Sequence, residues 1–298
     1  MTRTIRVRKA TPPNGMLTYR EALIRATDQL SAHPDLRPTA FPDATLLFTL
    51  AFAMTRATLM AHPDRCLDRE QQAIYQRLLE RRLRFEPMQY IVGETEFYGL
   101  PLKVTPAVLI PRPETELLVE TVAERLGKQD QLHIADVGTG SGAIAIALAH
   151  LLPLAKVTAV DLSTDALALA QTNASTNRLS DRIVFLQSDL LQAIPAGISF
   201  DCIVSNPPYI PSGDAPTLHP QVRDHEPALA LFSGLDGLDI YRRLVPQAHA
   251  LLTPGGLLAL EIGFDQRDAI AGLLDGWNDV EFLPDLQQIP RVALARRA

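Results

Sequence analysis

Apolar residues in the first third of the chain recur every three or four positions, which is the spacing of helices buried along one face. Leu23, Ile24 and Leu30 follow Tyr19 at this spacing. A second helix is predicted to begin near Pro42, because proline favours the first turn of a helix. Its apolar positions are Leu46, Leu47, Leu50, Phe52 and Met54.

A third helix is predicted after Asp68, whose side chain can cap the free backbone N–H groups of a first helical turn. Its apolar positions are Ile74, Leu78, Leu79 and Leu83. Its outer face is predicted to carry Arg77, Arg81, Arg82 and Arg84, with Glu80 and Glu86 interleaved. We interpret this face as solvated, with a docking surface for an acidic partner as the alternative. Residues 16–90 are thus expected to form a small helical N-terminal domain.

The pattern changes after residue 90. Residues 91–113 are rich in aromatic and β-branched residues and are broken by Gly99, Pro101 and Pro106, which favours a β-hairpin linker. From residue 114 to residue 298, strands alternate with helices. The predicted strands are 132–137, 157–161, 183–187, 200–205, 256–262, 279–283 and 291–296. The predicted helices are 115–126, 142–151, 164–176, 237–252 and 265–274. Such alternation indicates βαβ units and a mainly parallel sheet.

Composition narrows the class of protein. The chain of 298 residues is 47% hydrophobic and 21% charged, as in globular domains, and its net charge of −6 argues against a nucleic acid held directly. Cys66 and Cys202 are too few for a disulfide framework, and no His or Cys array predicts a metal site. No apolar stretch reaches the length of a membrane span, so a cytoplasmic protein without membrane contact is expected.

The basic residues 1–15 are interpreted as a disordered extension, or alternatively as an arm that touches ribosome or nucleic acid.

A glycine-rich loop joins the first predicted strand of the sheet to its helix. It reads Gly138-Thr139-Gly140-Ser141-Gly142, and its glycines allow a tight turn and a close approach of backbone to a ligand. The spacing is one residue shorter than the dinucleotide form, which favours a ligand lying across the loop over a diphosphate at the helix end. A tight turn without a ligand is the alternative.

Two acidic positions follow the next strands. Asp161 ends the second predicted strand, where a carboxylate can accept hydrogen bonds from both ribose hydroxyls of a nucleoside. It could instead cap the helix near Thr164, but Asp165 can fill that role, so we favour the ribose. After the third strand, Asp189 could accept from the amino group of an adenine, and Leu190 could cover its ring.

The tetrapeptide Asn206-Pro207-Pro208-Tyr209 directly follows the strand 200–205, so it should face the same crevice as the glycine loop. A planar NH₂ group is a poor nucleophile that must have its N–H groups held while its lone pair is aimed. The Asn206 side-chain oxygen and the Pro207 carbonyl can accept these hydrogen bonds, and Tyr209 offers a flat apolar face. The tetrapeptide therefore indicates methyl transfer to a planar nitrogen. A proline-rich strand exit with Tyr209 in the core is the alternative.

At this point the chain resembles the release factor glutamine methyltransferases, the PrmC/HemK family, over nearly its whole length after residue 16. In the N-terminal part the matching stretches are DATLL at 43–47 and AHPD at 61–64. The joint matches through EPMQYIVG at 86–93, EFYGL at 96–100 and LIPRPETE at 109–116. The last part matches through DVGTGSGAI at 136–144, SNPPYI at 205–210, VR at 222–223 and EPALAL at 226–231.

The resemblance implies a class I (Rossmann-like) seven-stranded methyltransferase sheet, a helical N-terminal domain that docks the substrate and a β-hairpin that joins them. It implies S-adenosyl-L-methionine bound by residues 138–142, Asp161, the region of Leu190 and Asn206. It also implies methylation of the side-chain amide (N5) of the glutamine in the Gly-Gly-Gln loop of peptide chain release factors, gripped by residues 206–209. Family members often carry an aromatic residue where Leu190 stands, and the extension 1–15 has no counterpart in the family.

Three functions therefore remain to be compared. The main one is protein glutamine methylation by Asn206, Pro207 and Tyr209, in a chain expected to be a monomer. The second is methylation of adenine-N6 or guanine-N2 in nucleic acid, whose amino groups are also planar. The third is a binding module that keeps the fold and transfers nothing, which the intact Asn206 and the intact glycine loop argue against.

Overall fold

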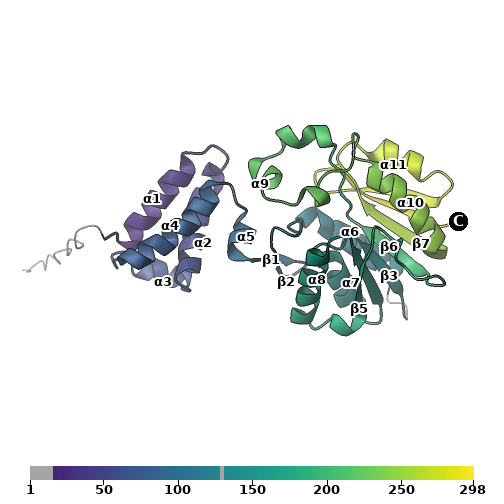
Figure 1. Cartoon of the computed structure of the whole chain (residues 1–298), viewed down its shortest axis with the longest axis horizontal. Helices are drawn as coiled ribbons and strands as arrows, with labels where there is room; N and C mark the ends of the chain where they lie inside the picture. Colours follow the sequence, from purple (N-terminus) through teal and green to yellow (C-terminus); the bar gives the residue numbers. More distant parts are fainter. Residues whose placement is uncertain (1–15, 128–130) are drawn as a thin grey trace, which may run out of the picture. The chain divides into compact units, whose positions relative to one another are not determined.

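The computed structural model describes residues 16–127 and 131–298 and divides at Val92 and Gly93 into two compact units. We call residues 16–92 the helical unit and residues 93–298 the sheet unit (Figure 1). The extension 1–15, which was predicted to be disordered, lies outside the described residues.

The helical unit is built from α1 (Tyr19–Ser31), α2 (Ala40–Ala51), α3 (Arg56–Ala61), α4 (Arg69–Leu83) and α5 (Met88–Val92) (Figure 1). Phe48 lies at its centre, with its ring edge-on to those of Tyr19 and Tyr75 at centroid distances of 4.9 and 5.0 Å. Asp68 caps α4 as predicted, since its carboxylate accepts from the Gln71 N–H at 2.8 Å and the Gln71 side chain accepts from the Asp68 N–H at 3.0 Å. Local sequence signals therefore set the helices, and one aromatic cluster joins them.

The prediction that Arg82 lies on a solvated face of α4 is wrong. The Arg82 side chain is buried, and its Nε donates to the Asp43 carboxylate of α2 at 2.7 Å. Arg81, on the same turn, makes a two-pronged contact with Glu86. The sequence pattern misled because arginine is mostly exposed, and only a partner far away in the chain makes its burial tolerable.

The predicted hairpin is present as β1 (Glu94–Phe97) and β2 (Leu100–Lys103), which pair antiparallel at the start of the sheet unit. A buried amide attaches the hairpin to the glycine loop. The Asn173 side chain accepts from the Lys103 N–H at 2.7 Å, and it donates to the carbonyls of Lys103 and Ser141 at 3.0 and 2.9 Å. Two hydrogen bonds of Asn173 therefore hold the hairpin, and a third ties the same side chain to the glycine loop.

The seven-stranded sheet predicted from the alternating pattern is confirmed. Its strands are β3 (His133–Val137), β4 (Lys156–Asp161), β5 (Ile183–Gln187), β6 (Phe200–Ser205), β7 (Leu252–Glu261), β8 (Asn278–Pro284) and β9 (Pro290–Arg296). Their order is β5-β4-β3-β6-β7-β9-β8, and β9 runs antiparallel to both of its neighbours. The strand order reverses between β3 and β6, so the carboxyl ends of these two strands form the point where ligands bind in open α/β sheets.

Helices cover both faces of this sheet, as its alternating apolar side chains require (Figure 1). One core contains residues of α6 (Pro113–Leu126), α7 (Ala143–Leu151) and α8 (Thr164–Thr176), packed with Ile134, Val204 and Ala259 of the sheet. The other contains residues of α10 (Asp239–Leu251) and α11 (Arg267–Leu273), packed with Ile203 and Leu258. The short helix α9 (Pro220–Arg223) belongs to the segment between β6 and α10. The two cores hold the strand ends rigidly on the side where the predicted site residues lie.

Candidate active site

The glycine loop is held by its own protein neighbours. The N–H groups of Gly138 and Thr139 donate to the Val160 carbonyl at 2.9 and 3.0 Å, and the Gly140 N–H donates to the Asp161 carboxylate at 2.8 Å. Because these amides already have acceptors, they are not offered to a diphosphate. This agrees with the expectation of a ligand that lies across the loop.

Asp136, near the end of β3, binds the glycine loop and the start of α7. Its carboxylate, fully buried, accepts from the Thr139 hydroxyl at 2.6 Å and from the Ala145 N–H at 3.1 Å. Its other oxygen has no hydrogen-bond partner. Burial raises the pKa of Asp136 to about 7, because a charged carboxylate is costly away from water. The sequence analysis gave Asp136 no role, although an acid at the end of an apolar strand was a visible signal.

Asp161 joins β4 to the loop rather than to the following helix. Its second oxygen accepts from the Ser163 N–H at 2.9 Å. The N-cap of α8 is Ser163, whose hydroxyl accepts from the Ala166 N–H, so the assignment of that role to Asp165 is wrong. Serine takes the position because its short side chain reaches the first turn from an extended backbone. Asp161 also lines the cavity beside the loop, where each carboxylate oxygen keeps a lone pair for a ligand.

A cavity of about 360 Å³ opens at the switch point between β3 and β6. The predicted site residues line it, with the exceptions of Gly142 and Tyr209. An added Cβ on Gly138 or Gly140 would meet no protein atom within 4 Å, so the space beside the loop is open to a ligand. The volume is in the range of small-molecule sites. The residues predicted from separate stretches of sequence therefore meet in one place.

Asp189 and Leu190 both line the cavity, but only Asp189 already has a charged partner. Asp189 lines it, but its carboxylate also pairs with Arg243 of α10 at 2.5 Å. Leu190 lines it with an unusual backbone φ of +54°. An adenine amino group at Asp189 would therefore share that carboxylate with a guanidinium, whereas the apolar contact predicted for Leu190 meets no competing group.

Asn206 is held by side chains that the sequence analysis did not select. Its amide nitrogen donates to the Thr115 hydroxyl at 3.0 Å, and that hydroxyl donates to the Glu261 carboxylate at 2.6 Å. Thr115 lies in the first turn of α6, and Glu261 is the last residue of β7. Thr115 and Glu261 are both buried, and burial raises the pKa of Glu261 to about 7. The amide oxygen of Asn206 can still accept a hydrogen bond, because only the amide nitrogen is used by Thr115.

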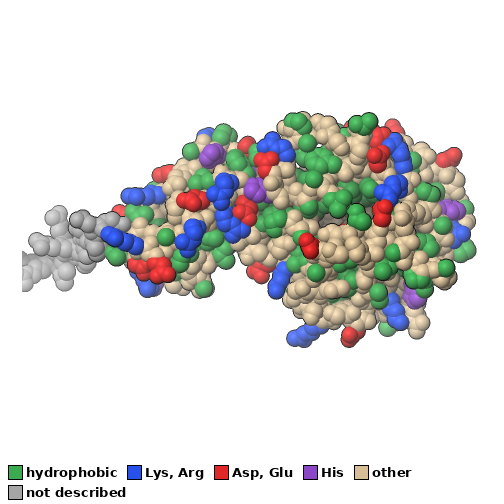
Figure 2. All heavy atoms as spheres, in the orientation of Figure 1, with side chains coloured by type: hydrophobic (Ala, Val, Ile, Leu, Met, Phe, Trp, Pro, Cys, Tyr) green, Lys and Arg blue, Asp and Glu red, His purple; other side chains and the backbone are tan. Residues whose placement is uncertain are grey.

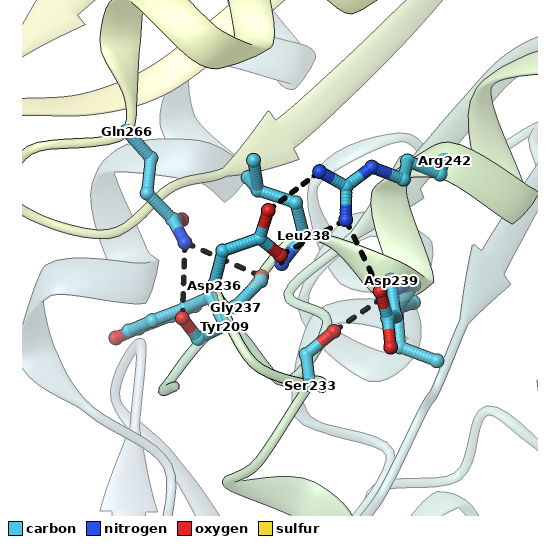
Figure 3. A network of polar contacts seen from close by, with 9 residues as sticks. Tyr209, Ser233, Asp236, Gly237, Leu238, Asp239, Arg242 and Gln266 are labelled. Atoms are coloured by element: carbon cyan, nitrogen blue, oxygen red, sulfur yellow. Dashed lines mark hydrogen bonds and ion pairs between the residues drawn. The ribbon is translucent and has the colours of Figure 1, made fainter. Parts of the chain in front are cut away.

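Tyr209 is fixed by its backbone and by its hydroxyl. Figure 3 shows the Gln266 side chain directed at the carbonyls of Tyr209 and Gly237, to which its nitrogen donates at 3.0 and 3.3 Å. Gly237 has a φ of +77°, and an added Cβ would stand 2.2 Å from the Tyr209 carbonyl, so this position requires glycine. The Tyr209 hydroxyl lies 3.5 Å from Glu261, and burial raises the pKa of Tyr209 to about 12.

Two further walls of the cavity come from segments 107–115 and 227–230. An ion pair holds these segments together, since Arg112 Nη2 donates to the Glu226 carboxylate at 2.6 Å. The Glu226 side chain is fully buried, and its other oxygen accepts from the Ile110 N–H at 3.4 Å. Sequence reasoning quoted these stretches only for their resemblance to a family. A lone Arg and a lone Glu more than a hundred positions apart gave no signal that they meet.

Among residues 16–127 and 131–298, no group of three or more His, Cys, Asp or Glu side chains could hold a metal ion. In the same residues no helix combines the length and the apolarity that crossing a membrane requires.

The parts of this site define a class of protein. The sheet is open and has the glycine loop at its switch point, an acid at the end of β4 and Asn-Pro-Pro-Tyr directly after β6. This is the arrangement of an S-adenosylmethionine-dependent methyltransferase. Residues 113–219 match the family model of the methyltransferase small domain, and residues 21–93 match that of the PrmC N-terminal domain.

Full-length relatives identify the family. A release factor glutamine methyltransferase of Koribacter versatilis is 44% identical over 281 residues, covering 94% of this chain and 99% of the relative. One of Moorella thermoacetica is 45% identical over 284 residues, with coverage of 94% and 99%. The chain belongs to the release factor glutamine methyltransferases, a family that uses S-adenosylmethionine. Among solved structures, the hMettl16 catalytic domain in complex with a 3′UTR hairpin superposes with a TM-score of 0.56 at 15% identity, over 78% of this chain and 85% of that one, which shows a shared fold.

Proposed function

We propose that this enzyme transfers the methyl group of S-adenosylmethionine to the side-chain amide nitrogen (N5) of the glutamine in the Gly-Gly-Gln loop of peptide chain release factors. The single observation that carries the proposal is the orientation of the Asn206 side-chain amide. Its nitrogen is already committed to Thr115 at 3.0 Å, so its oxygen is the atom available to accept a hydrogen bond from a substrate NH₂ group.

The cavity fits the cofactor in its chemistry. We assign the ribose to Asp161, the adenine to the Leu190 side of the cavity and the amino-acid part to the glycine loop. The open space beside Gly138 and Gly140 supports this assignment, as does the acid at the carboxyl end of β4. The cofactor supplies an electrophilic methyl carbon.

The protein supplies position rather than a strong base. Asn206 and the Pro207 carbonyl hold the two N–H groups of the substrate amide, and the Tyr209 ring packs against its plane. The nitrogen lone pair is thereby aimed at the methyl carbon. As the C–N bond forms, the methyl–sulfur bond of the cofactor would break, S-adenosylhomocysteine would leave as a neutral thioether, and one N–H proton would pass to water. Holding two reactants in line is the largest contribution that such a site can make to the rate.

The visible surface supports a protein substrate. On the face shown in Figure 2, apolar side chains gather near the middle of the sheet unit, and acidic and basic side chains are interspersed around them. On the part of that face formed by the sheet unit, these interspersed charges leave no continuous basic surface for a nucleic-acid backbone, and the net charge of −6 agrees with this.

The proposal is tested with purified enzyme, isotope-labelled cofactor and four acceptors, namely a release factor, the same factor with the loop glutamine replaced by alanine, tRNA and duplex DNA. We expect label in the first acceptor alone and a mass increase of one methyl group on the peptide with the Gly-Gly-Gln loop. Label in a nucleic acid but not in the release factor would overturn the proposal in favour of a nucleic-acid amino-group methyltransferase.

A further inference from the structure

We infer that Glu261, acting through Thr115, is a positioning residue whose ionised form keeps the Asn206 amide turned with its oxygen toward the substrate, and whose protonation releases it. The inference deepens the proposed function and rests on it for the identity of the substrate. It adds a pH-sensitive control of the same site.

The sheet places these three residues together. Ser205 of β6 pairs with Leu260 of β7 in parallel register, so the next residues, Asn206 and Glu261, leave adjacent strands side by side. Glu261 continues the alternation of Leu257 and Ala259, whose side chains lie in the core that α6 covers. Thr115, in the first turn of α6, therefore lies where it can bridge the two strand ends, and its hydroxyl contacts both side chains.

Counting hydrogens gives the direction of the relay. A threonine hydroxyl has one hydrogen and an ionised carboxylate has none, so Thr115 must donate to Glu261 at 2.6 Å. Thr115 can then only accept from Asn206, which selects the amide nitrogen for this contact and leaves the oxygen for the substrate. A protonated Glu261 can itself donate to Thr115, whose hydrogen is then free to bond the Asn206 oxygen. The amide turned in that way would offer N–H groups to a substrate that also carries N–H groups.

The groups around Glu261 place this exchange near neutral pH. Its side chain faces Glu114 on α6, Arg291 on β9 and the Tyr209 hydroxyl after β6. Tyr241 of α10 donates to the backbone carbonyl of Glu261 at 2.7 Å. Arg291 and the hydrogen bonds favour the ionised carboxylate, whereas burial and Glu114 oppose it. Burial is the largest effect and raises the pKa of Glu261 to about 7.

The kinetic test compares wild type with Glu261→Gln, Thr115→Val and Thr115→Ser on a release factor at saturating cofactor. With a pKa of about 7, we expect wild-type kcat to fall about tenfold from pH 8 to pH 6. Glutamine does not ionise and can present either its oxygen or its NH₂ group to Thr115, so it cannot fix the direction of that hydroxyl. Glu261→Gln should therefore be slower than wild type at pH 8, by up to about tenfold, and flat with pH, with an unchanged KM for cofactor. Thr115→Val should behave in the same way, and Thr115→Ser, which keeps the hydroxyl, should restore the wild-type profile. A wild-type profile in Glu261→Gln would overturn the inference.

A second measurement does not depend on the substrate. The side-chain ¹⁵N–¹H₂ resonances of Asn206, identified by their loss in Asn206→Ser, are followed from pH 6 to pH 8 in the free enzyme. We expect them to shift with a midpoint near 7 in wild type and to stay constant in Glu261→Gln. Constant wild-type resonances would overturn the relay even if methylation is found. Failure of wild type to methylate any release factor would overturn the proposed function while the resonances still decide the relay.

Discussion

A carboxamide presents an acceptor on one side and a donor on the other, and the two sides have nearly the same shape. Asn206 can serve a substrate NH₂ group only in one of its two orientations, so its neighbours matter as much as its identity. Thr115 of α6 and Glu261 of β7 determine which orientation the Asn206 amide takes.

Replacing Asn206 by alanine removes the acceptor without touching the cofactor side of the cavity. We expect Asn206→Ala to lower turnover roughly 10²–10³-fold, as loss of one preorganised polar group does. The Kd for cofactor should stay within about twofold, because the residues that we assign to the cofactor lie mainly in the glycine loop and after β4 and β5. Single-turnover kinetics and calorimetry measure the two quantities. Asn177→Ala, which removes a surface contact with the hairpin, is the matched control and should leave both unchanged.

Asp161→Ala should weaken cofactor binding by about 2 kcal/mol, or roughly 30-fold, because ribose hydroxyls and the Gly140 N–H lose their acceptor. Ser163→Ala is the comparison: Ser163 also lines the cavity, and this change removes the cap of α8 while it keeps the backbone N–H that Asp161 accepts. Calorimetry of both variants separates loop from helix. Equal affinity in Asp161→Ala and wild type would show that the ribose is bound elsewhere.

At this scale the sequence revealed residues whose position in a motif is itself informative. Asp161 and Asn206 each follow a predicted strand directly, and the structure brings both to one cavity. Thr115 and Glu261 could not be selected, because their importance lies in a contact across 146 positions of chain. A lone acid at the end of the apolar run that forms β7 was the only available hint.

At the scale of helices and strands, local signals gave the type of each element better than its ends. The second helix was predicted from Pro42, yet α2 begins at Ala40. Proline is tolerated anywhere in a first turn, because N–H groups there have no helical partner. β7 was predicted from residue 256 but begins at Leu252. Its pairing with β6 continues through a shift of register between the pairs Phe200–Leu252 and Cys202–Leu257, so the chain stays in the sheet.

The buried pair between α2 and α4 leads to a stability prediction. Arg82→Met leaves the Asp43 carboxylate buried with only the Thr39 hydroxyl as a partner, and we expect a loss of about 3–5 kcal/mol. Urea unfolding followed by far-UV circular dichroism measures it. Arg77→Met, on an exposed part of the same helix, should change stability by less than about 0.5 kcal/mol. Equal stability of the two variants would contradict the role of the pair.

At the scale of the whole molecule, the buried acids should make stability depend on pH. The pKa of Asp136 rises from 3.8 to about 7 on folding, so the folded state binds more protons between these values. Stability is therefore greatest below about pH 4 for this group and is lost as pH rises through 7. We expect the urea midpoint of the sheet unit, followed by its sole tryptophan, Trp277, to fall from pH 5 to pH 8. Asp136→Asn should reduce this slope, and an unchanged slope would assign it to other groups.

The alternating pattern predicted a mainly parallel sheet and its seven strands, and the resemblance to a family implied the class I arrangement. The strand order, which the structure adds, follows from packing. β9 lies between β7 and β8 in the sheet. No local sequence signal predicts this position, because strand order depends on which apolar faces pack together. Likewise, the division of the chain at residue 92 depends on contacts, whereas the change of pattern at residue 90 shows only that the elements differ.

The three hydrogen bonds of Asn173 have a practical meaning for protein engineering. Because this amide joins the β1–β2 hairpin to the backbone at Ser141, the hairpin should be kept together with the nucleoside-binding sheet unit. A chimaera that takes its helical unit from a relative should be spliced at residue 92. A splice after residue 103 would import a foreign hairpin against a native asparagine and disturb methyl-donor affinity from a distance.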